Sequence, residues 1–206
     1  MAEGRDGCGH LPETPEELYA RVSAEGLRMP PVEEWETWPF EGALRPRALQ
    51  PPVEAERPRI GEDAADCWRC QRGDEHAIWS DERWLVTPTP APNGLPCVVL
   101  LFPRRHVDLG ELDDEEAGEL GRMLVRCERA VRAVPDVGRV HVCRWGDGSY
   151  HLHYWLMARP ARFPQLIGNF AAVWDDVLPP TPQSVWDENL RLVARALAAA
   201  GGVAHV

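Results

Sequence analysis

The sequence lacks any apolar run long enough to cross a membrane. No uninterrupted apolar stretch reaches the roughly 18 residues that a spanning helix needs, so we expect a soluble protein without a membrane partner. The first residues, Met1–Asp6, include three charged side chains, and no apolar stretch follows them. We therefore expect no secretory signal and a cytoplasmic location.

Positive charge is also scarce. The chain has 22 lysine and arginine residues against 33 aspartate and glutamate residues, which gives a net charge of −11. Binding of a nucleic-acid polymer needs a basic face, so this class of partner is disfavoured. One local cluster, Arg104-Arg105-His106, is enough for a small ligand that carries phosphate.

Internal repeats are absent, and the length of 206 residues fits one large domain or one domain with extensions. Twenty prolines and 17 glycines indicate many loops and disfavour a helix bundle. We divide the chain into an N-terminal extension (1–60), a core (61–160) and a C-terminal extension (161–206).

The N-terminal extension combines a helix signal with a proline-rich arm. Thr14-Pro15 followed by Glu16-Glu17 predicts a short helix that ends near Gly26. From 29 to 60 prolines recur every few residues, and three large aromatic residues stand among them: Trp35, Trp38 and Phe40. We expect an extended arm that lays these rings over the main domain.

The core and the C-terminal extension alternate between strand and helix patterns. Strands are predicted at about 76–80, 83–87, 96–102 and 138–145, and helices at 113–134 and 184–200. Residues 161–183 are expected to be irregular. The order of strands, helix, strands and helix predicts an α+β fold with an antiparallel sheet.

Two histidines lie in the apolar and aromatic stretch 148–157, which predicts a further strand. Side chains alternate faces in a strand, so His151 and His153 share a face with Trp155, and the two imidazoles lie about 7 Å apart. That separation suits a metal ligand and a substrate-facing group. The alternative is that both rings are hydrogen-bonded in a core.

Six cysteines are present, and in a cytoplasmic protein they are thiols or metal ligands more often than disulfides. Cys67-Trp68-Arg69-Cys70 has three interpretations: a redox pair, a chance occurrence or half of a zinc site. A redox pair should follow a strand and open a helix. This pair follows a polar, acidic stretch and ends on Gly73, which favours zinc.

Two further ligands complete such a site. His106 follows a predicted strand in the turn Pro103-Arg104-Arg105-His106, and His151 opens the stretch described above. Four ligands leave no open position for water, so the site is predicted to hold a structural Zn²⁺. The predicted ligands are Cys67, Cys70, His106 and His151.

These motifs together resemble the histidine-triad superfamily, in particular its branch related to galactose-1-phosphate uridylyltransferase and the zinc-bearing hydrolases. The matching pieces are the Cys-x-x-Cys, the strand that ends in Pro-Arg-Arg-His, the helix with an acidic start and His-Leu-His-Tyr-Trp at 151–155. The resemblance covers about residues 61–160. It implies an antiparallel sheet with packed helices, homodimers, and a small-molecule nucleotide or nucleotide conjugate as substrate.

The resemblance also assigns roles. His151 closes the zinc site, and His153 is the nucleophile on an α-phosphate, giving a nucleotidyl-histidine. Charge that develops on phosphorus needs donors, and the candidates are Ser149, Gly148 and the neighbouring amides, Arg104 and Arg105. The alternatives are a plain turn for the first two and solvated charges for the arginines.

Trp155 departs from the family pattern, which has His or Gln at this position. An indole can donate a hydrogen bond but cannot accept one or move a proton. Either the reaction needs no acid here, because the leaving group is good, or the protein binds a nucleotide or a protein partner without catalysis. A third interpretation is a zinc-scaffolded protein of unrelated fold.

Overall fold

The structure is a computed structural model that describes residues 15–26, 31, 34–35, 38–45 and 48–206. The chain divides into two units, the first with residues 1–35 and 40–57 and the second with 36–39 and 58–206. The first unit contains helix α1 (Pro15–Glu25), which confirms the predicted helix and its end before Gly26. Its predicted cap, Thr14, lies outside the described residues.

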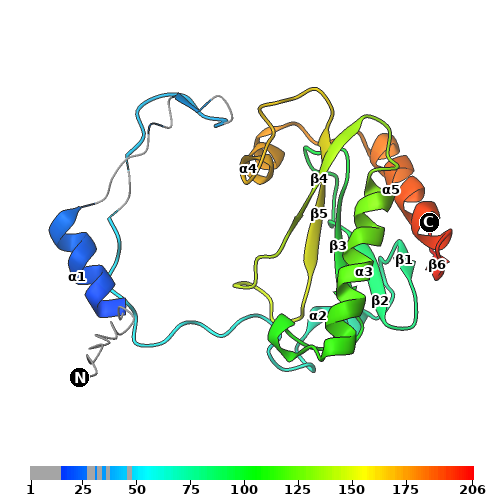
Figure 1. The fold of residues 1–206 in the computed structure, drawn as a ribbon, viewed down its shortest axis with the longest axis horizontal. Helices are drawn as coiled ribbons and strands as arrows, with labels where there is room; N and C mark the ends of the chain where they lie inside the picture. The colour runs from blue at the N-terminus through cyan, green and yellow to red at the C-terminus, as the bar shows by residue number, and fades with distance from the viewer. Residues whose placement is uncertain (1–14, 27–30, 32–33, 36–37, 46–47) are drawn as a thin grey trace, which may run out of the picture. The chain divides into compact units, whose positions relative to one another are not determined.

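The second unit is built on one sheet of six strands in the order β4-β5-β3-β2-β1-β6, in which every neighbouring pair is antiparallel (Figure 1). The predicted α+β fold with an antiparallel sheet is confirmed. The strands are β1 (Trp79–Ser80), β2 (Trp84–Pro88), β3 (Val98–Pro103), β4 (Val137–Cys143), β5 (Tyr154–Pro160) and β6 (Val203–Ala204).

Two long helices cover one face of this sheet, α3 (Asp114–Val131) and α5 (Gln183–Ala198) (Figure 1). The start of α3 is a capping box, since the Asp113 side chain accepts from the Glu116 amide and the Glu116 side chain accepts from the Asp113 amide. Both helices confirm the predictions to within a few residues.

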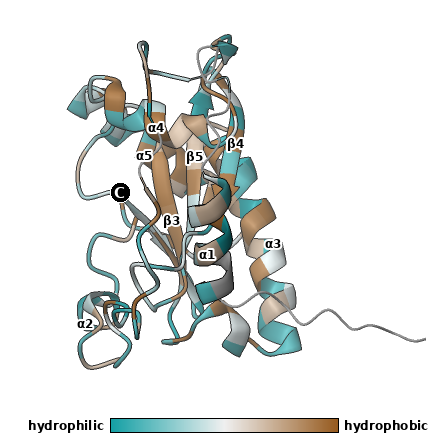
Figure 2. Ribbon diagram, turned by 90° about the vertical axis from the view of Figure 1, so that its left-hand side faces the viewer, coloured by the Kyte–Doolittle hydropathy of each residue, from teal (hydrophilic) through white to brown (hydrophobic). Residues whose placement is uncertain are grey.

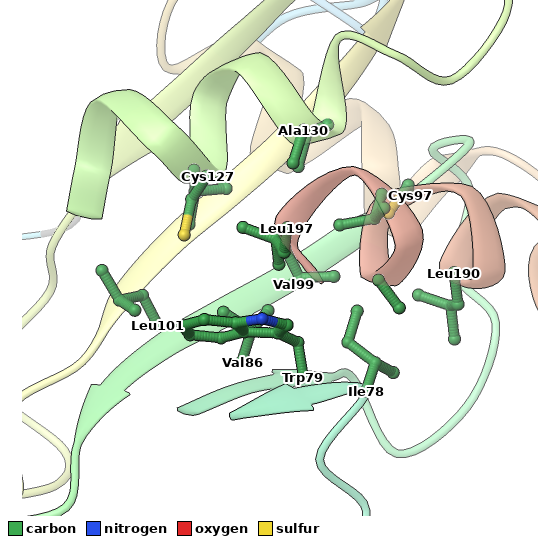
Figure 3. Packing of buried hydrophobic residues seen from close by; sticks show 14 of the residues in the cluster. Ile78, Trp79, Val86, Cys97, Val99, Leu101, Cys127, Ala130, Leu190 and Leu197 are labelled. Atoms are coloured by element: carbon green, nitrogen blue, oxygen red, sulfur yellow. The ribbon is translucent and has the colours of Figure 1, made fainter. Parts of the chain in front are cut away.

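The main core lies between these helices and the sheet. Figure 3 shows Trp79, Val99 and Leu101 of the strands facing Cys127 of α3 and Leu197 of α5. All five are at most 1% exposed, so their apolar surface is removed from water almost completely. Burial of this kind is the main source of the stability of the fold.

The opposite face of the sheet is covered only in part. Helix α4 (Phe170–Val177) packs a smaller cluster over Val98 and Met157. Trp38, one of the three arm aromatics, belongs to this unit and meets Phe170 edge-on at 5.4 Å. Figure 2 shows that β3 is apolar along its length.

Two predictions about the elements were wrong. Residues 161–183 are not irregular, since they contain α4. The histidine strand begins at Tyr154, so His151 and His153 lie just before it. The edge strand β6 was not predicted.

In the described part of the chain, no helix is long and apolar enough to cross a membrane.

Candidate metal centre and cavity

The four predicted zinc ligands come together in the structure. Their ligand atoms all lie within 4.8 Å of one another. Cys67 caps the short helix α2 (Trp68–Arg72), and Cys70 lies within it. His106 follows β3, and His151 precedes β5. The Nδ1 atom of His151 lies 3.4 Å from Cys67 Sγ and 3.5 Å from Cys70 Sγ, and Nδ1 of His106 lies 3.4 Å from Cys70 Sγ.

These distances fit a tetrahedral metal site. With Zn–S near 2.3 Å and Zn–N near 2.05 Å, tetrahedral geometry puts sulfur and nitrogen about 3.6 Å apart. The observed separations of 3.4 and 3.5 Å agree with this spacing. The residues present therefore fit a four-coordinate metal ion, and together they would fill all four of its positions.

The second nitrogen of each histidine meets a backbone carbonyl. His151 Nε2 donates to the carbonyl of Pro103 at 2.8 Å, and His106 Nε2 donates to that of Glu62 at 3.3 Å. These bonds place the proton on Nε2 and leave the Nδ1 lone pair for a metal, the arrangement common around metal-ligating histidines.

Burial adjusts the protonation of the cluster. Loss of hydration lowers the pKa of His151 to about 4, so its ring is neutral at pH 7. Burial, together with the nearby Cys67, raises the pKa of the Cys70 thiol to about 11. A bound cation stabilises the thiolate form, so metal binding here releases protons.

His153 is held differently from His151. Its Nδ1 donates to the carbonyl of His151 at 2.9 Å, which leaves Nε2 as the nitrogen with a free lone pair. Its ring lies 5.7 Å from the Phe102 ring and 6.3 Å from the Trp155 ring. The two histidines therefore have different surroundings, since His151 belongs to the Cys2His2 cluster and His153 lines a cavity.

A cavity of about 1070 Å³ lies over the uncovered face of the sheet, beside His153. Its floor follows the cross-strand pairs, with Trp155 beside Leu100 and Leu100 beside Thr87. Aromatic walls come from Trp68 and Phe102. A mostly apolar cavity with a few polar groups is the usual form of a small-molecule site.

Ser149 and Trp155, both of them predicted site residues, also line this cavity. Gly148 is not among the lining residues, and its carbonyl accepts from the Ile60 amide at 2.9 Å. Trp155 meets Trp145 edge-on at 5.9 Å. The structure thus brings His153, Ser149 and Trp155 to one cavity.

The two arginines predicted to bind phosphate are in ion pairs. Arg104 makes a bidentate contact with Asp74 at 2.5 and 3.0 Å, and Arg105 makes one with Glu116 at 2.5 and 2.8 Å. Neither lines the cavity.

The cations that do line the cavity are Arg69 and Arg72 of α2. Arg69 is 2% exposed, lies over the rings of Trp68 and Phe102 at 5.2 and 5.8 Å, and donates from Nη2 to the carbonyl of Gly73. Burial lowers the pKa of Arg69. Arg69 lies within the Cys-x-x-Cys motif and Arg72 lies two residues after it. The sequence analysis did not predict that they line the cavity, although their closeness to the motif was a signal for it.

Solved structures to which this chain is similar include a zinc-bound histidine triad family protein from Mycobacterium smegmatis, which is 23% identical over 67% of this chain and 97% of that one, with a TM-score of 0.49. This chain is similar to histidine-triad proteins. A Hit-like protein from Bartonella henselae is 18% identical over 59% of this chain and 85% of that one, with a TM-score of 0.44.

A uridylyltransferase is 20% identical over 65% of this chain and 45% of that one, also with a TM-score of 0.44. No family profile and no curated protein matches the sequence. At these identities and TM-scores the histidine-triad likeness says nothing of activity, which has to be argued from the residues of the site.

Proposed function

We propose that this protein is a nucleotidyl transferase or nucleotide phosphohydrolase that acts through a nucleotidyl-histidine on His153. The observation that carries the proposal is the 2.9 Å hydrogen bond from His153 Nδ1 to the His151 carbonyl, at the edge of the cavity. This bond fixes the tautomer in which Nε2 is the nucleophile.

In the first step the Nε2 lone pair attacks the α-phosphorus of a nucleotide. A P–N bond forms while the bond from phosphorus to the leaving oxygen breaks, and the leaving group departs with that electron pair. The ring becomes a cation. Its proton stays on Nδ1 and remains hydrogen-bonded to the His151 carbonyl. In the second step water or an acceptor phosphate attacks phosphorus, the P–N electron pair returns to Nε2, and a proton from attacking water passes to solvent.

The proposal needs donors for the charge on the phosphoryl oxygens. Ser149 lines the cavity and supplies a hydroxyl and an amide, and Gly148 lies in the bend before it. Arg104 and Arg105 would first have to leave Asp74 and Glu116. Of the two arginines that line the cavity, Arg69 is buried and its Nη2 donates to the carbonyls of Gly73 and Glu75. We therefore assign the binding of substrate phosphates to Arg72, which is exposed and meets Glu75 only in a long contact of 3.6 Å.

Trp155 sets the class of leaving group. Because indole cannot transfer a proton, the proposal requires a group that departs without protonation, such as pyrophosphate or a nucleoside phosphate. The second candidate function is nucleotide binding without turnover, and Trp155 is the observation that favours it. This second candidate is supported if the wild type binds nucleotides without any turnover and Trp155→Gln or Trp155→His gains turnover.

A structural Zn²⁺ is part of the proposal. When bound, it holds α2, the residue after β3 and the segment before β5 together, and it supplies no reactive position. The contacts described above support this role for four residues: Cys67, Cys70, His106 and His151.

The proposal also includes a homodimer. Among the described strands β4 is an outer strand of the sheet, and a strand edge is a ready site for pairing with a second chain. Light scattering coupled to size-exclusion chromatography tests this part, since a monomer mass at all concentrations would refute it.

The test of the activity is intact mass measured under non-acidic conditions, because a P–N bond is acid-labile. The protein is incubated with nucleoside diphosphates, triphosphates, dinucleotides and nucleotide sugars. We expect an adduct of nucleotidyl mass on the wild type and on His76→Ala, which changes an exposed histidine on the rim of the same cavity. His153→Ala should form none. An adduct that persists on His153→Ala would refute the assignment of the nucleophile.

A further inference from the structure

The turn that carries Ser149 is held from behind by a short segment far away in the sequence, residues 59–62, which we call the strap. The Ile60 amide donates to the Gly148 carbonyl at 2.9 Å, and the Tyr150 amide donates to the Ile60 carbonyl at 3.1 Å. These two bonds form an isolated parallel bridge between Ile60 and Ser149.

The side chain of Arg59 adds a second set of contacts. Its Nη1 donates to the Gly146 carbonyl at 3.1 Å and to the Asp108 carboxylate at 2.7 Å, and its guanidinium lies 4.7 Å from the centre of the Tyr150 ring. Asp108 is shared, because Arg144 donates to its other oxygen. Arg59 thus joins the turn 146–150 to the residues that follow His106.

The strap also contacts the group of four residues formed by Cys67, Cys70, His106 and His151. The carbonyl of Glu62 accepts from His106 Nε2 at 3.3 Å, and the Glu62 carboxylate accepts from the Arg59 amide at 3.1 Å. A Cβ atom at Gly61 would lie 3.0 Å from Cys67 Cα, a tight contact, and the φ angle of +71° at this position also favours glycine. Residues 59–62 therefore lie between the metal ligands and the turn.

This arrangement dictates where the Ser149 amide points. The carbonyl of Gly148 and the N–H of Ser149 belong to one trans peptide, so they point in opposite directions. Because the carbonyl faces Ile60, the Ser149 N–H faces away from the strap, and Ser149 itself lines the cavity. An aimed backbone N–H is the kind of donor that stabilises developing negative charge.

We infer that Arg59 is a positioning residue, which holds the turn 146–149 so that the amide of Ser149 is aimed at the phosphoryl oxygens of a substrate in the cavity. The inference rests on the proposed function. It adds that the segment before the Cys-x-x-Cys is part of the reaction machinery and not only a connection to the N-terminal extension.

The test compares Arg59→Ala with Arg191→Ala, which removes an exposed arginine paired with Glu188 on α5. The rate of adduct formation is measured in a single turnover with the nucleotide found above. We expect Arg59→Ala to slow it about tenfold to a hundredfold, the size of effect that misplacement by about 1 Å produces, and Arg191→Ala to leave it unchanged. Metal content should be the same in both.

Two further readouts separate positioning from a general loss of structure. Guanidinium chloride, at a concentration too low to unfold the protein, should restore much of the lost rate in Arg59→Ala and none in a variant that has merely lost its fold. Hydrogen exchange should rise in residues 144–152 and not in α3.

A rate in Arg59→Ala equal to that in Arg191→Ala would overturn the inference, and so would a slow rate that guanidinium leaves unchanged. If the wild type forms no adduct with any nucleotide, the proposed function fails. In that case hydrogen exchange decides whether the strap holds the turn, and unchanged exchange in residues 144–152 would refute that too.

Discussion

Replacing Cys70 with Ser should separate the metal from the protein and lower the stability of the whole second unit. Cys70 Sγ meets both histidine ligands, one 36 residues away in the sequence and the other 81 residues away. A metal held at this point therefore closes two long loops. Closing one loop of this length removes about 4 kcal/mol of chain entropy from the unfolded state, so the two together contribute about 8 kcal/mol.

This contribution is comparable with the whole stability of a domain, about 5–15 kcal/mol. A serine leaves three ligands and weak residual binding, so we expect the free energy of unfolding to fall by about 3–5 kcal/mol. For a chain of this size such a loss lowers the Tm by about 10 °C.

The assay measures metal per protein chain by mass spectrometry, together with thermal and urea unfolding. Cys143→Ser is the matched control, because Cys143 is a half-buried free cysteine on β4 outside the cluster. It should keep one metal ion and lose about 1 kcal/mol or less. If Cys70→Ser binds as much zinc as the wild type, or unfolds at the same temperature, the metal centre assigned above is wrong.

Three other changes have distinct expected outcomes. Trp155→Gln should speed turnover of substrates with poor leaving groups, measured by product release, because an amide can accept as well as donate a hydrogen bond; unchanged turnover would argue that Trp155 does not face the leaving group. Leu156→Ala should cost about 3–4 kcal/mol in urea unfolding, since Leu156 is 0% exposed in the main core. Asp74→Asn should cost about 0.5 kcal/mol at pH 7, because the hydrogen bonds from Arg104 lower the pKa of Asp74 but both groups are partly exposed and screened. The lowered pKa of Asp74 lies below the ordinary aspartate value of about 3.9. As the pH falls through this pKa the wild-type carboxylate also becomes neutral, so the cost of Asp74→Asn should vanish. A cost that does not change with pH would refute the pairing.

The strongly patterned parts of the fold could be predicted from the sequence. Helix α3 is indicated by the capping box of Asp113 and Glu116 and by buried residues at helical spacing, and both are local signals. The clustering of Cys67, Cys70, His106 and His151 could also be predicted, because two cysteines and two histidines, each placed in a turn or at the end of a strand, form a donor set that tetrahedral Zn²⁺ prefers.

Helix α4 could not be predicted, for a physical reason. It has only 8 residues, and Asn169 before it makes no side-chain capping bond. A helix this short is unstable by itself. What holds it is tertiary: Asp175 accepts from the Leu95 amide at 2.8 Å and from the Asn93 side chain at 2.9 Å, about 80 residues away.

The ion pairs of the arginines could not be predicted from the sequence for a similar reason. Arg104 and Arg105 look available in the sequence, but their partners Asp74 and Glu116 are 30 and 11 residues away. Arg59 belongs to no motif, and its contacts with Gly146 and Asp108 form only when the fold brings these residues beside it.

The spread of the proposed metal ligands along the chain has a consequence for biosynthesis. Cys67 leaves the ribosome 84 residues before His151. At about 5–20 residues per second, its thiol waits about 4–17 s for the last ligand of the cluster. During that interval the two cysteines have no complete set of ligands to shield them from oxidation or from a competing metal. The yield of correctly metallated protein should therefore depend on translation speed and on the supply of zinc during synthesis.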